Sequence, residues 1–312
     1  MIVGIDIGGT SIKIGLVSHN GKINHKTSYL VNTNLSQDKM LIELAEYIKD
    51  WILEHKIKNI EGIGIGCPGV INSLKGRCDH SANLNWTNLE ICPLLEKLLG
   101  YPCKITNDAN AAALGEAKFG AGKKYHDSVM ITLGTGVGGG VVINDKLFEG
   151  NEGKGAELGH MIIKMNGRKC SCGLHGCFET YASASALIKD TKKAMKKNIK
   201  SKMWNLVNFD LNNVNGTTCF EASKQNDETA KKVVEQYVSF LGQGIINICN
   251  IFRPNAIILG GGISLQKEYL TNKIYDYCAK LNFGFKNSPK VDIITSTLGN
   301  DAGIIGAASL FM

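Results

Sequence analysis

The chain has 312 residues and a formal net charge of +7, with 44% of its residues hydrophobic and 20% charged. This length and composition are ordinary for a globular protein with two domains and substantial cores. No run approaches the roughly 18 apolar residues that span a bilayer, and Asp6 and Lys13 interrupt the apolar N-terminus, which no basic segment precedes. We therefore expect a cytoplasmic protein with no signal peptide and no membrane partner.

The positive charge is concentrated in the lysine-rich segment 189–202. No aromatic residues are interleaved with these lysines, as they are in many surfaces that bind single-stranded nucleic acid. The pattern therefore favours a solvated helix face, and we expect no nucleic-acid partner.

The first half of the chain alternates short apolar runs with amphipathic segments. Residues 38–55 place five apolar side chains on one helical face, namely Leu41, Leu44, Ala45, Ile48 and Ile52. The predicted elements are strands over 2–9 and 12–17, a helix over 38–55, a strand over 60–70, and a helix over 108–118 that begins after Asn107, a good N-cap.

The second half repeats this design. The segment 129–145 is again an apolar strand, a glycine-rich turn and an apolar strand, and 256–264 is a later strand that ends in glycines, like 60–70. A long amphipathic helix is predicted over 228–252 and a short helix over 301–311. Because strands and helices alternate in both halves, we predict an α/β protein with two similar lobes.

No stretch between the lobes has the composition of a flexible linker. We therefore place a tight hinge near residue 107 and expect the C-terminal helix to return to the first lobe. The small N-terminal lobe would comprise residues 1–107 and 298–312, and the large lobe residues 108–297.

The segment 134-GTGVGG-139 satisfies the GxGxxG pattern of dinucleotide-binding proteins. In that role it should open a helix, whereas here it runs into the β-branched strand 141–143. What remains is a hairpin whose backbone N–H groups can bind an anion at a tight turn. Glycines that serve only the turn would explain one hairpin. Two such hairpins, together with 259-LGGGIS-264, favour a nucleotide in a cleft between the lobes.

Asp6 lies inside the apolar run 2–9, where a carboxylate is costly unless a partner neutralises it. Beside a phosphate-binding turn, we expect that partner to be Mg²⁺ with its water ligands. Gly8, Gly9, Thr10 and Lys13 would lie near the same phosphates.

Three of the ten cysteines are clustered with a histidine in 160-HMIIKMNGRKCSCGLHGCFE-179. His160, Cys170, Cys172 and Cys177 could fill all four positions of a structural tetrahedral zinc site. A Cys-x-Cys pair is not the Cys-x-x-Cys redox motif, and the plainer alternative is three free cysteines on a loop. The other seven cysteines are scattered, and we expect them to be reduced.

Asn107 and Asp108 stand at the predicted start of a helix. On the residues alone, they are an N-cap followed by an acid in the first turn, where the helix dipole favours negative charge. Glu157, on the same basis, is a solvated carboxylate.

The order of the motifs resembles that of one family. DIGGTSIKIGLV, GCPG, NDANAAALGEA, LGTGVGGG, GAELGH, CSCGLHGCFE and ILGGG follow one another as in the ROK sugar kinases (repressors, open reading frames, kinases), over essentially the whole chain. The resemblance implies the duplicated actin/hexokinase-like (ribonuclease H-like) ATPase fold, with two lobes around a cleft. Ser171 departs from the family's zinc loop, where glycine is frequent at this position, but it is not a proposed ligand.

The resemblance also implies roles for individual residues. Asp108 would be the catalytic base that accepts the proton of the attacking sugar hydroxyl. One ring nitrogen of His160 would bind zinc while the other binds a sugar hydroxyl. The sugar-binding residues would be Asn83, Asn107, Asp108, Glu157, His160 and Glu179. The residues that bind ATP and its phosphates would be Asp6, Gly8, Gly9, Thr10, Lys13, Thr135, Gly136, Gly261 and Gly262. Zinc would be held by His160, Cys170, Cys172 and Cys177, and Mg²⁺ through Asp6.

We therefore predict an ATP-dependent hexose kinase that phosphorylates glucose at its 6-hydroxyl, with Mg-ATP and a structural Zn²⁺ as cofactors. Glucose is favoured because 83-NLNW-86 and CFETYAS resemble the glucokinase branch. The alternatives are a kinase for N-acetylmannosamine, N-acetylglucosamine, allose or fructose, and a sugar-sensing transcriptional repressor. Repressors of the family carry an added N-terminal DNA-binding domain, whereas the first phosphate strand here starts at Ile2. The resemblance suggests a homodimer or homotetramer and leaves open whether ATP or polyphosphate is the donor.

Overall fold

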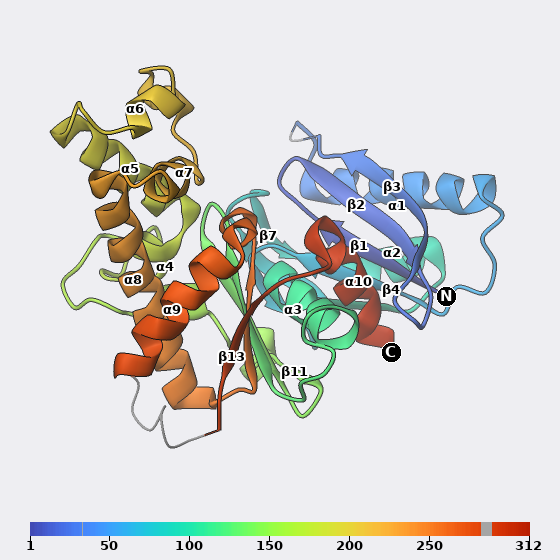
Figure 1. Ribbon diagram of the computed structural model, residues 1–312. Coiled ribbons are helices and arrows are strands. Elements are labelled where there is room, and N and C mark those ends of the chain that lie inside the picture. The colour runs from blue at the N-terminus through green and yellow to red at the C-terminus, as the bar shows by residue number, and fades with distance from the viewer. Residues whose placement is uncertain (33, 282–288) are drawn as a thin grey trace. The chain divides into compact units, whose positions relative to one another are not determined.

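The computed structural model describes residues 1–32, 34–281 and 289–312 (Figure 1). The chain divides into two compact units. Unit 1 consists of Met1–Asp127, Gly140–Ala156 and Thr297–Met312, and unit 2 of Ser128–Gly139 and Glu157–Ser296. These boundaries differ from those of the lobes predicted from the sequence, which were 1–107 with 298–312 and 108–297. Helix α3, which starts at residue 108, belongs to unit 1, where it packs against α10.

The first sheet contains five strands in the order β3-β2-β1-β4-β8. Strands β1, β4 and β8 are parallel to one another, and β2 is antiparallel to both of its neighbours. The strands are β1 (Ile2–Ile7), β2 (Ser11–Val17), β3 (Ile23–Leu30), β4 (Gly62–Cys67) and β8 (Cys103–Asn107).

The second sheet has the order β11-β10-β9-β12-β13 and so repeats the first sheet strand for strand. Strands β9, β12 and β13 are parallel, and β10 and β11 form an antiparallel hairpin. The shared order confirms the internal duplication predicted from the two glycine-rich hairpins. The strands are β9 (Ser128–Leu133), β10 (Val137–Ile143), β11 (Lys146–Phe148), β12 (Ala256–Gly260) and β13 (Asp292–Thr295).

Helices connect the parallel strands, as the alternating pattern predicts. The helices of unit 1 are α1 (Gln37–Glu54), α2 (Ile91–Leu99), α3 (Asp108–Phe119) and α10 (Ala302–Ala308). Those of unit 2 are α4 (Glu179–Ala182), α5 (Ala184–Lys197), α6 (Met203–Leu206), α7 (Thr218–Lys224), α8 (Glu228–Phe252) and α9 (Glu268–Leu281). Short 3₁₀ helices are η1 (Asn151–Gly153), η2 (Leu158–His160), η3 (Leu211–Asn213), η4 (Gly262–Gln266), η5 (Gly299–Asp301) and η6 (Ser309–Phe311).

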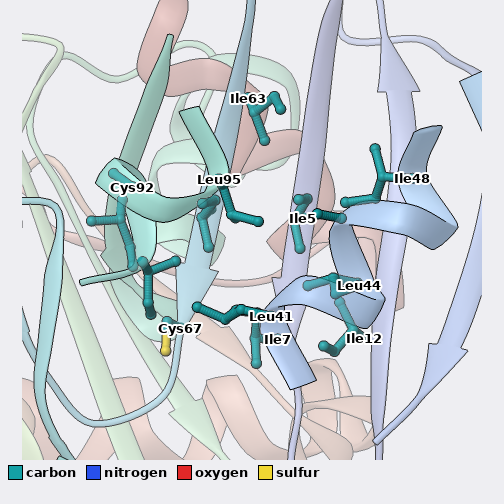
Figure 2. Packing of buried hydrophobic residues seen from close by; sticks show 14 of the residues in the cluster. Ile5, Ile7, Ile12, Leu41, Leu44, Ile48, Ile63, Cys67, Cys92 and Leu95 are labelled. Atoms are coloured by element: carbon teal, nitrogen blue, oxygen red, sulfur yellow. The ribbon is translucent and has the colours of Figure 1, made fainter. Parts of the chain in front are cut away.

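One face of the first sheet forms a hydrophobic core with α1 and α2. Side chains alternate along each strand, so Val3, Ile5 and Ile7 of β1 all enter this core. Figure 2 shows α1 over β1 and β2, and α2 beside β4, through the labelled side chains Leu41, Leu44, Ile48, Cys92 and Leu95. The helical face predicted over 38–55 is the buried face of α1, except that Ile52 is only half-buried.

The opposite face of this sheet accepts α10 at very close range. A Cβ atom at Gly4 would lie 2.1 Å from the carbonyl oxygen of Ile304, and one at Gly64 would lie 1.8 Å from that of Ala307. The backbone of α10 therefore rests directly on β1 and β4. Several glycines of the runs 2–9 and 60–70 thus serve helix packing as well as turns.

Gly306→Ala is expected to lower the stability of unit 1. A Cβ at Gly306 would lie 1.6 Å from the carbonyl oxygen of Ala111 in α3. Overpacking of this kind typically costs about 1–3 kcal/mol, whereas helix propensity alone would make the change stabilising by roughly 1 kcal/mol. Denaturant titration distinguishes overpacking from helix propensity, because the first lowers the unfolding midpoint and the second raises it. A raised midpoint would contradict the close packing of α10 on α3.

A small antiparallel sheet in unit 1 was not predicted from the sequence. It has the order β5-β6-β7, with β5 (Val70–Asn72), β6 (Arg77–Ser81) and β7 (Trp86–Leu89). Trp86 is buried in the core, as expected for a packing residue, and Asn83 is exposed in the turn between β6 and β7. Among the residues that the structure describes, none of the helices combines the length and hydropathy that a bilayer crossing demands.

Candidate functional site

In unit 1, the predicted site residues gather where parallel strands end. Strands β1, β4 and β8 run side by side, with Asp6 paired to Gly66 and Gly66 paired to Thr106. Their carboxyl ends lead into Gly8, Pro68 and Asp108. In open α/β sheets, ligands bind at this edge of the sheet.

Asn107 and Asp108 connect β8 to α3. The Asn107 side chain caps the helix by accepting a hydrogen bond from the N–H of Ala109 at 2.9 Å, and its amide donates to the carbonyl oxygen of Gly69 at 3.1 Å. The predicted N-cap is therefore confirmed, and the cap also joins the Pro68-Gly69 turn to the helix start. One carboxylate oxygen of the half-buried Asp108 accepts a hydrogen bond from Ala109 N–H at 3.0 Å.

The Asp108 carboxylate also raises the pKa of Cys67, a buried thiol at the carboxyl end of β4. Contact with Cys78, burial and the nearby Asp108 carboxylate all raise the pKa of Cys67, with the Cys78 contact the largest cause. The buried Cys67 thiol is therefore favoured in its neutral form.

Asp6 has a protein partner that the sequence did not predict. Asp6 and Lys13 are direct cross-strand neighbours in β1 and β2, and Lys13 Nζ lies 3.3 Å from a carboxylate oxygen of Asp6. The lysine lowers the cost of placing this carboxylate in an apolar strand. Both groups lie beside the turn at Gly8, whose N–H donates to the carbonyl oxygen of Ser11 at 3.0 Å.

The turn between β1 and β2 also approaches the small sheet. Gly9 and Thr10 are exposed, and a Cβ at Gly9 would lie 4.0 Å from the carbonyl oxygen of Asn83. The structure thus brings Asn83 next to the first glycine turn, although the two are more than 70 residues apart in sequence.

Sequence reasoning missed the contacts of the segment that precedes Glu157. Thr106 Oγ1 donates a 2.5 Å hydrogen bond to a carboxylate oxygen of Glu149, and Lys154 Nζ lies 2.8 Å from Asp79 in β6. These contacts hold the segment 149–156 against β8 and against the small sheet. No local pattern signals them, because each joins residues far apart in the chain.

The second hairpin forms as predicted and does not open a helix, and its turn belongs to unit 2. Its turn is closed by a hydrogen bond from the N–H of Gly134 to the carbonyl oxygen of Gly136 at 3.1 Å, and Thr135 is exposed at its tip. Gly261, with φ of +80°, lies beside the end of β9, where a Cβ would be 2.5 Å from the carbonyl oxygen of Leu133. Thr135, Gly136, Gly261 and Gly262 therefore lie at one end of two neighbouring parallel strands, β9 and β12.

The predicted metal ligands come together in unit 2. The ligand atoms of His160, Cys170, Cys172 and Cys177 all lie within 4.8 Å of one another. Cys172 Sγ is 3.6 Å from Cys177 Sγ, and Cys170 Sγ is 3.7 Å from His160 Nδ1. All ten cysteines are free, so these thiols are not joined in a disulfide. The four residues can hold one metal ion, with Nδ1 as the nitrogen of His160 that faces it.

Glu157 and Glu179 lie on either side of this cluster in the chain. Partial burial raises the pKa of Glu157, His160 opposes the rise and the Glu179 carboxylate adds to it. Glu179 begins α4 and accepts a hydrogen bond from the N–H of Val137 at 3.1 Å. The three groups predicted to bind sugar in this unit, Glu157, His160 and Glu179, are therefore close together.

The chain is similar to glucokinases over almost its whole length. It is 35% identical to a glucokinase from Thermotoga maritima, over 99% of this chain and 96% of the relative. Its structure resembles that of a ROK family glucokinase from Streptomyces griseus in complex with glucose and AMPPNP, with a TM-score of 0.82, 30% identity, and coverage of 99% and 98% of the two chains. It is also 30% identical to a xylose repressor from Caldicellulosiruptor bescii, over 99% of this chain and 77% of the repressor.

The solved neighbours and the strand order agree with the duplicated actin/hexokinase-like fold that the motifs implied. The description of the ROK family fits the chain from residue 2 to residue 312. With glucokinases at 32–35% identity over almost the full length of both chains, the chain belongs to the ROK family.

Proposed function

We propose that this protein is an ATP-dependent glucokinase, which transfers the γ-phosphate of ATP to the 6-hydroxyl of glucose. The observation that carries the proposal is the carboxylate of Asp108 at the carboxyl end of a parallel strand, beside the anchored amide of Asn107. It stands in a chain that is similar to glucokinases from end to end.

In this reaction the protein mainly positions the reactants and neutralises charge, and it forms no covalent bond to them. The oxygen of the 6-hydroxyl forms a bond to the γ-phosphorus, while the bond from that phosphorus to the bridging oxygen of ADP breaks. The hydroxyl proton passes to the carboxylate of Asp108, which acts as the base. The start of α3 suits this role, because the capped helix fixes the backbone of Asp108 at the carboxyl end of β8.

Sugar recognition is assigned to side chains of both units. In unit 1, Asn83, Asn107 and Asp108 are the proposed hydroxyl ligands. In unit 2, they are Glu157, His160 and Glu179. The supporting observation is that each set is assembled by its own unit, although each draws on residues from separate loops.

Mg-ATP would bind to the two glycine hairpins and the loop after β12. Gly8, Gly9, Thr10 and Lys13 would face phosphates in unit 1, and Thr135, Gly136, Gly261 and Gly262 would contact the nucleotide in unit 2. Asp6 would hold Mg²⁺ through water, with Lys13 beside it. The exposed glycine turns, which can offer backbone N–H groups to an anion, support this assignment.

Zinc fits the cluster of His160, Cys170, Cys172 and Cys177. A tetrahedral site with bonds of about 2.3 Å to sulfur separates its ligand atoms by roughly 3.8 Å. The distance of 3.6 Å between Cys172 Sγ and Cys177 Sγ is close to that value, and Cys170 Sγ lies 3.7 Å from Nδ1 of His160. Because protein fills all four positions, the zinc would be structural: it would hold Nδ1 of His160 and leave Nε2–H aimed at the sugar.

The proposal extends to the compartment and the partners of the protein. Free thiols that serve as metal ligands suit a reducing compartment, so we assign the protein to the cytoplasm. Its partners would be the hexose and ATP, with a second copy of the chain in a homodimer or a homotetramer.

A coupled-enzyme assay with Mg-ATP across a hexose panel tests the proposal. The panel contains glucose, mannose, fructose, allose, N-acetylglucosamine and N-acetylmannosamine. We expect the highest kcat/KM with glucose and only weak turnover with the N-acetylated sugars. A higher value for another hexose would reassign the substrate, and polyphosphate in place of ATP tests the donor. Inactivity on every sugar, with tight binding to operator DNA, would replace the kinase by a repressor.

A further inference from the structure

Glu179 makes its closest contacts with the phosphate hairpin. Its Oε2 accepts a hydrogen bond from the N–H of Val137 at 3.1 Å, and a Cβ at Gly136 would lie only 2.2 Å from the same oxygen. Gly136 is not among the glycines with positive φ, so its φ does not demand glycine. The three atoms nearest to such a Cβ all belong to the Glu179 side chain, so an alanine at this position would displace the carboxylate.

The other side of Glu179 faces the metal cluster. Its Oε1 lies 3.9 Å from Cys170 Sγ. The next helix adds a second tie to the hairpin, because the N–H of Ala184 donates to the carbonyl oxygen of Gly134 at 2.8 Å. A single half-buried carboxylate thus stands between the turn assigned to ATP and the residues assigned to glucose.

We propose that Glu179 is a positioning residue that couples the phosphate hairpin to the sugar site, in addition to binding sugar itself. The inference rests on the proposed function. The hairpin N–H of Val137 orients the carboxylate for a sugar hydroxyl, and the carboxylate in turn holds the hairpin in the shape that receives phosphate. Coupling of this kind is reciprocal, so a change at either end alters affinity at the other.

The first test changes a residue of the hairpin and measures the affinity for glucose. Gly136→Ala is expected to raise the Kd for glucose roughly tenfold or more, by calorimetry without nucleotide, because the added methyl displaces Oε2 and breaks a hydrogen bond to a charged group. The matched control is Gly134→Ala in the same turn, where a Cβ meets nothing within 4 Å. We expect the control to leave the glucose Kd unchanged.

The second test changes the carboxylate and measures the nucleotide. Glu179→Ala is expected to weaken binding of Mg-AMPPNP several-fold in the absence of sugar, since Val137 loses its acceptor. Glu179→Gln keeps an oxygen that can accept from Val137, so it should restore nucleotide affinity while glucose affinity stays reduced. A purely structural role for Glu179 would predict no such separation of the two affinities.

The outcomes separate this inference from the proposed function. If the parent protein phosphorylates glucose but Gly136→Ala binds glucose as the parent does, the coupling is wrong and the kinase stands. An unchanged AMPPNP affinity in Glu179→Ala would overturn it independently, which covers the case in which Gly136→Ala fails to fold. If the parent binds no glucose, the proposed function itself fails.

Discussion

Asp108→Asn is expected to fold normally and to bind glucose with little change, but to phosphorylate it about 10²–10⁴-fold more slowly than the parent. The amide keeps the shape and the hydrogen bond from Ala109 N–H, so α3 and the Asn107 cap should persist. What is lost is the group that takes the hydroxyl proton. The measurement is kcat in the coupled assay, with glucose affinity determined separately by calorimetry.

The competing explanation is that Asp108 only stabilises the first turn of a helix. Asp38 offers a matched control, because it is an exposed acid in the first turn of α1, which is capped by Ser36. Asp38→Asn removes the same charge from the same kind of position, and we expect full turnover from it. Near-parental turnover by Asp108→Asn would remove Asp108 as the base.

Cys172→Ser is expected to abolish stoichiometric metal binding. The parent should contain about one zinc per chain, because its four ligand atoms all lie within 4.8 Å of one another and can converge on one tetrahedral ion. Backbone N–H groups, that of Leu174 first among them, lower the pKa of Cys172 and so favour the thiolate that binds a metal, and a serine hydroxyl cannot replace it. Without the metal His160 is no longer held in one orientation, so the KM for glucose should rise by roughly 10–100-fold.

Metal analysis of the purified variants checks the stoichiometry, and a glucose titration checks the KM. His175→Ala is the control, since His175 is exposed in the same loop but outside the cluster, and it should retain the zinc. Prolonged treatment of the parent with a chelator should reproduce the effect of Cys172→Ser on KM. Full zinc content in Cys172→Ser would show that this thiol is not a ligand.

Much of the fold follows from local patterns. The period of 38–55 predicts α1, the apolar runs around two glycine turns predict both hairpins, and Asn107 predicts the start of α3. The small sheet β5-β6-β7 could not be predicted in this way, because its strands are three to five residues long and alternate only weakly. The packing role of Gly4 and Gly64 was also hidden, since their partners in α10 lie about 240–300 residues away.

In the candidate site, too, local motifs could be predicted from the sequence, whereas contacts between distant residues could not. The metal cluster could be predicted because its four ligand types are concentrated in eighteen residues, and their spacing in the chain restricts their spacing in the fold. The partner of Asp6 was expected to be Mg²⁺, and Lys13 was placed nearby without being recognised as a direct neighbour across two strands. The contact between Glu179 and Gly136 joins segments 43 residues apart and carries no local signal.

The position of α10 has a consequence for the order in which the chain can fold during translation. The sheet that begins at Ile2 has a face on which Gly4 and Gly64 meet the backbone of α10, and α10 lies in the segment Thr297–Met312. A nascent chain therefore leaves the part of that face under α10 exposed until almost all of the protein has left the ribosome, and it must rely on slow, long-range contacts to finish its earliest domain. Shortened chains that lack the last sixteen residues should accordingly need chaperones or aggregate, even though every proposed ligand-binding residue is present.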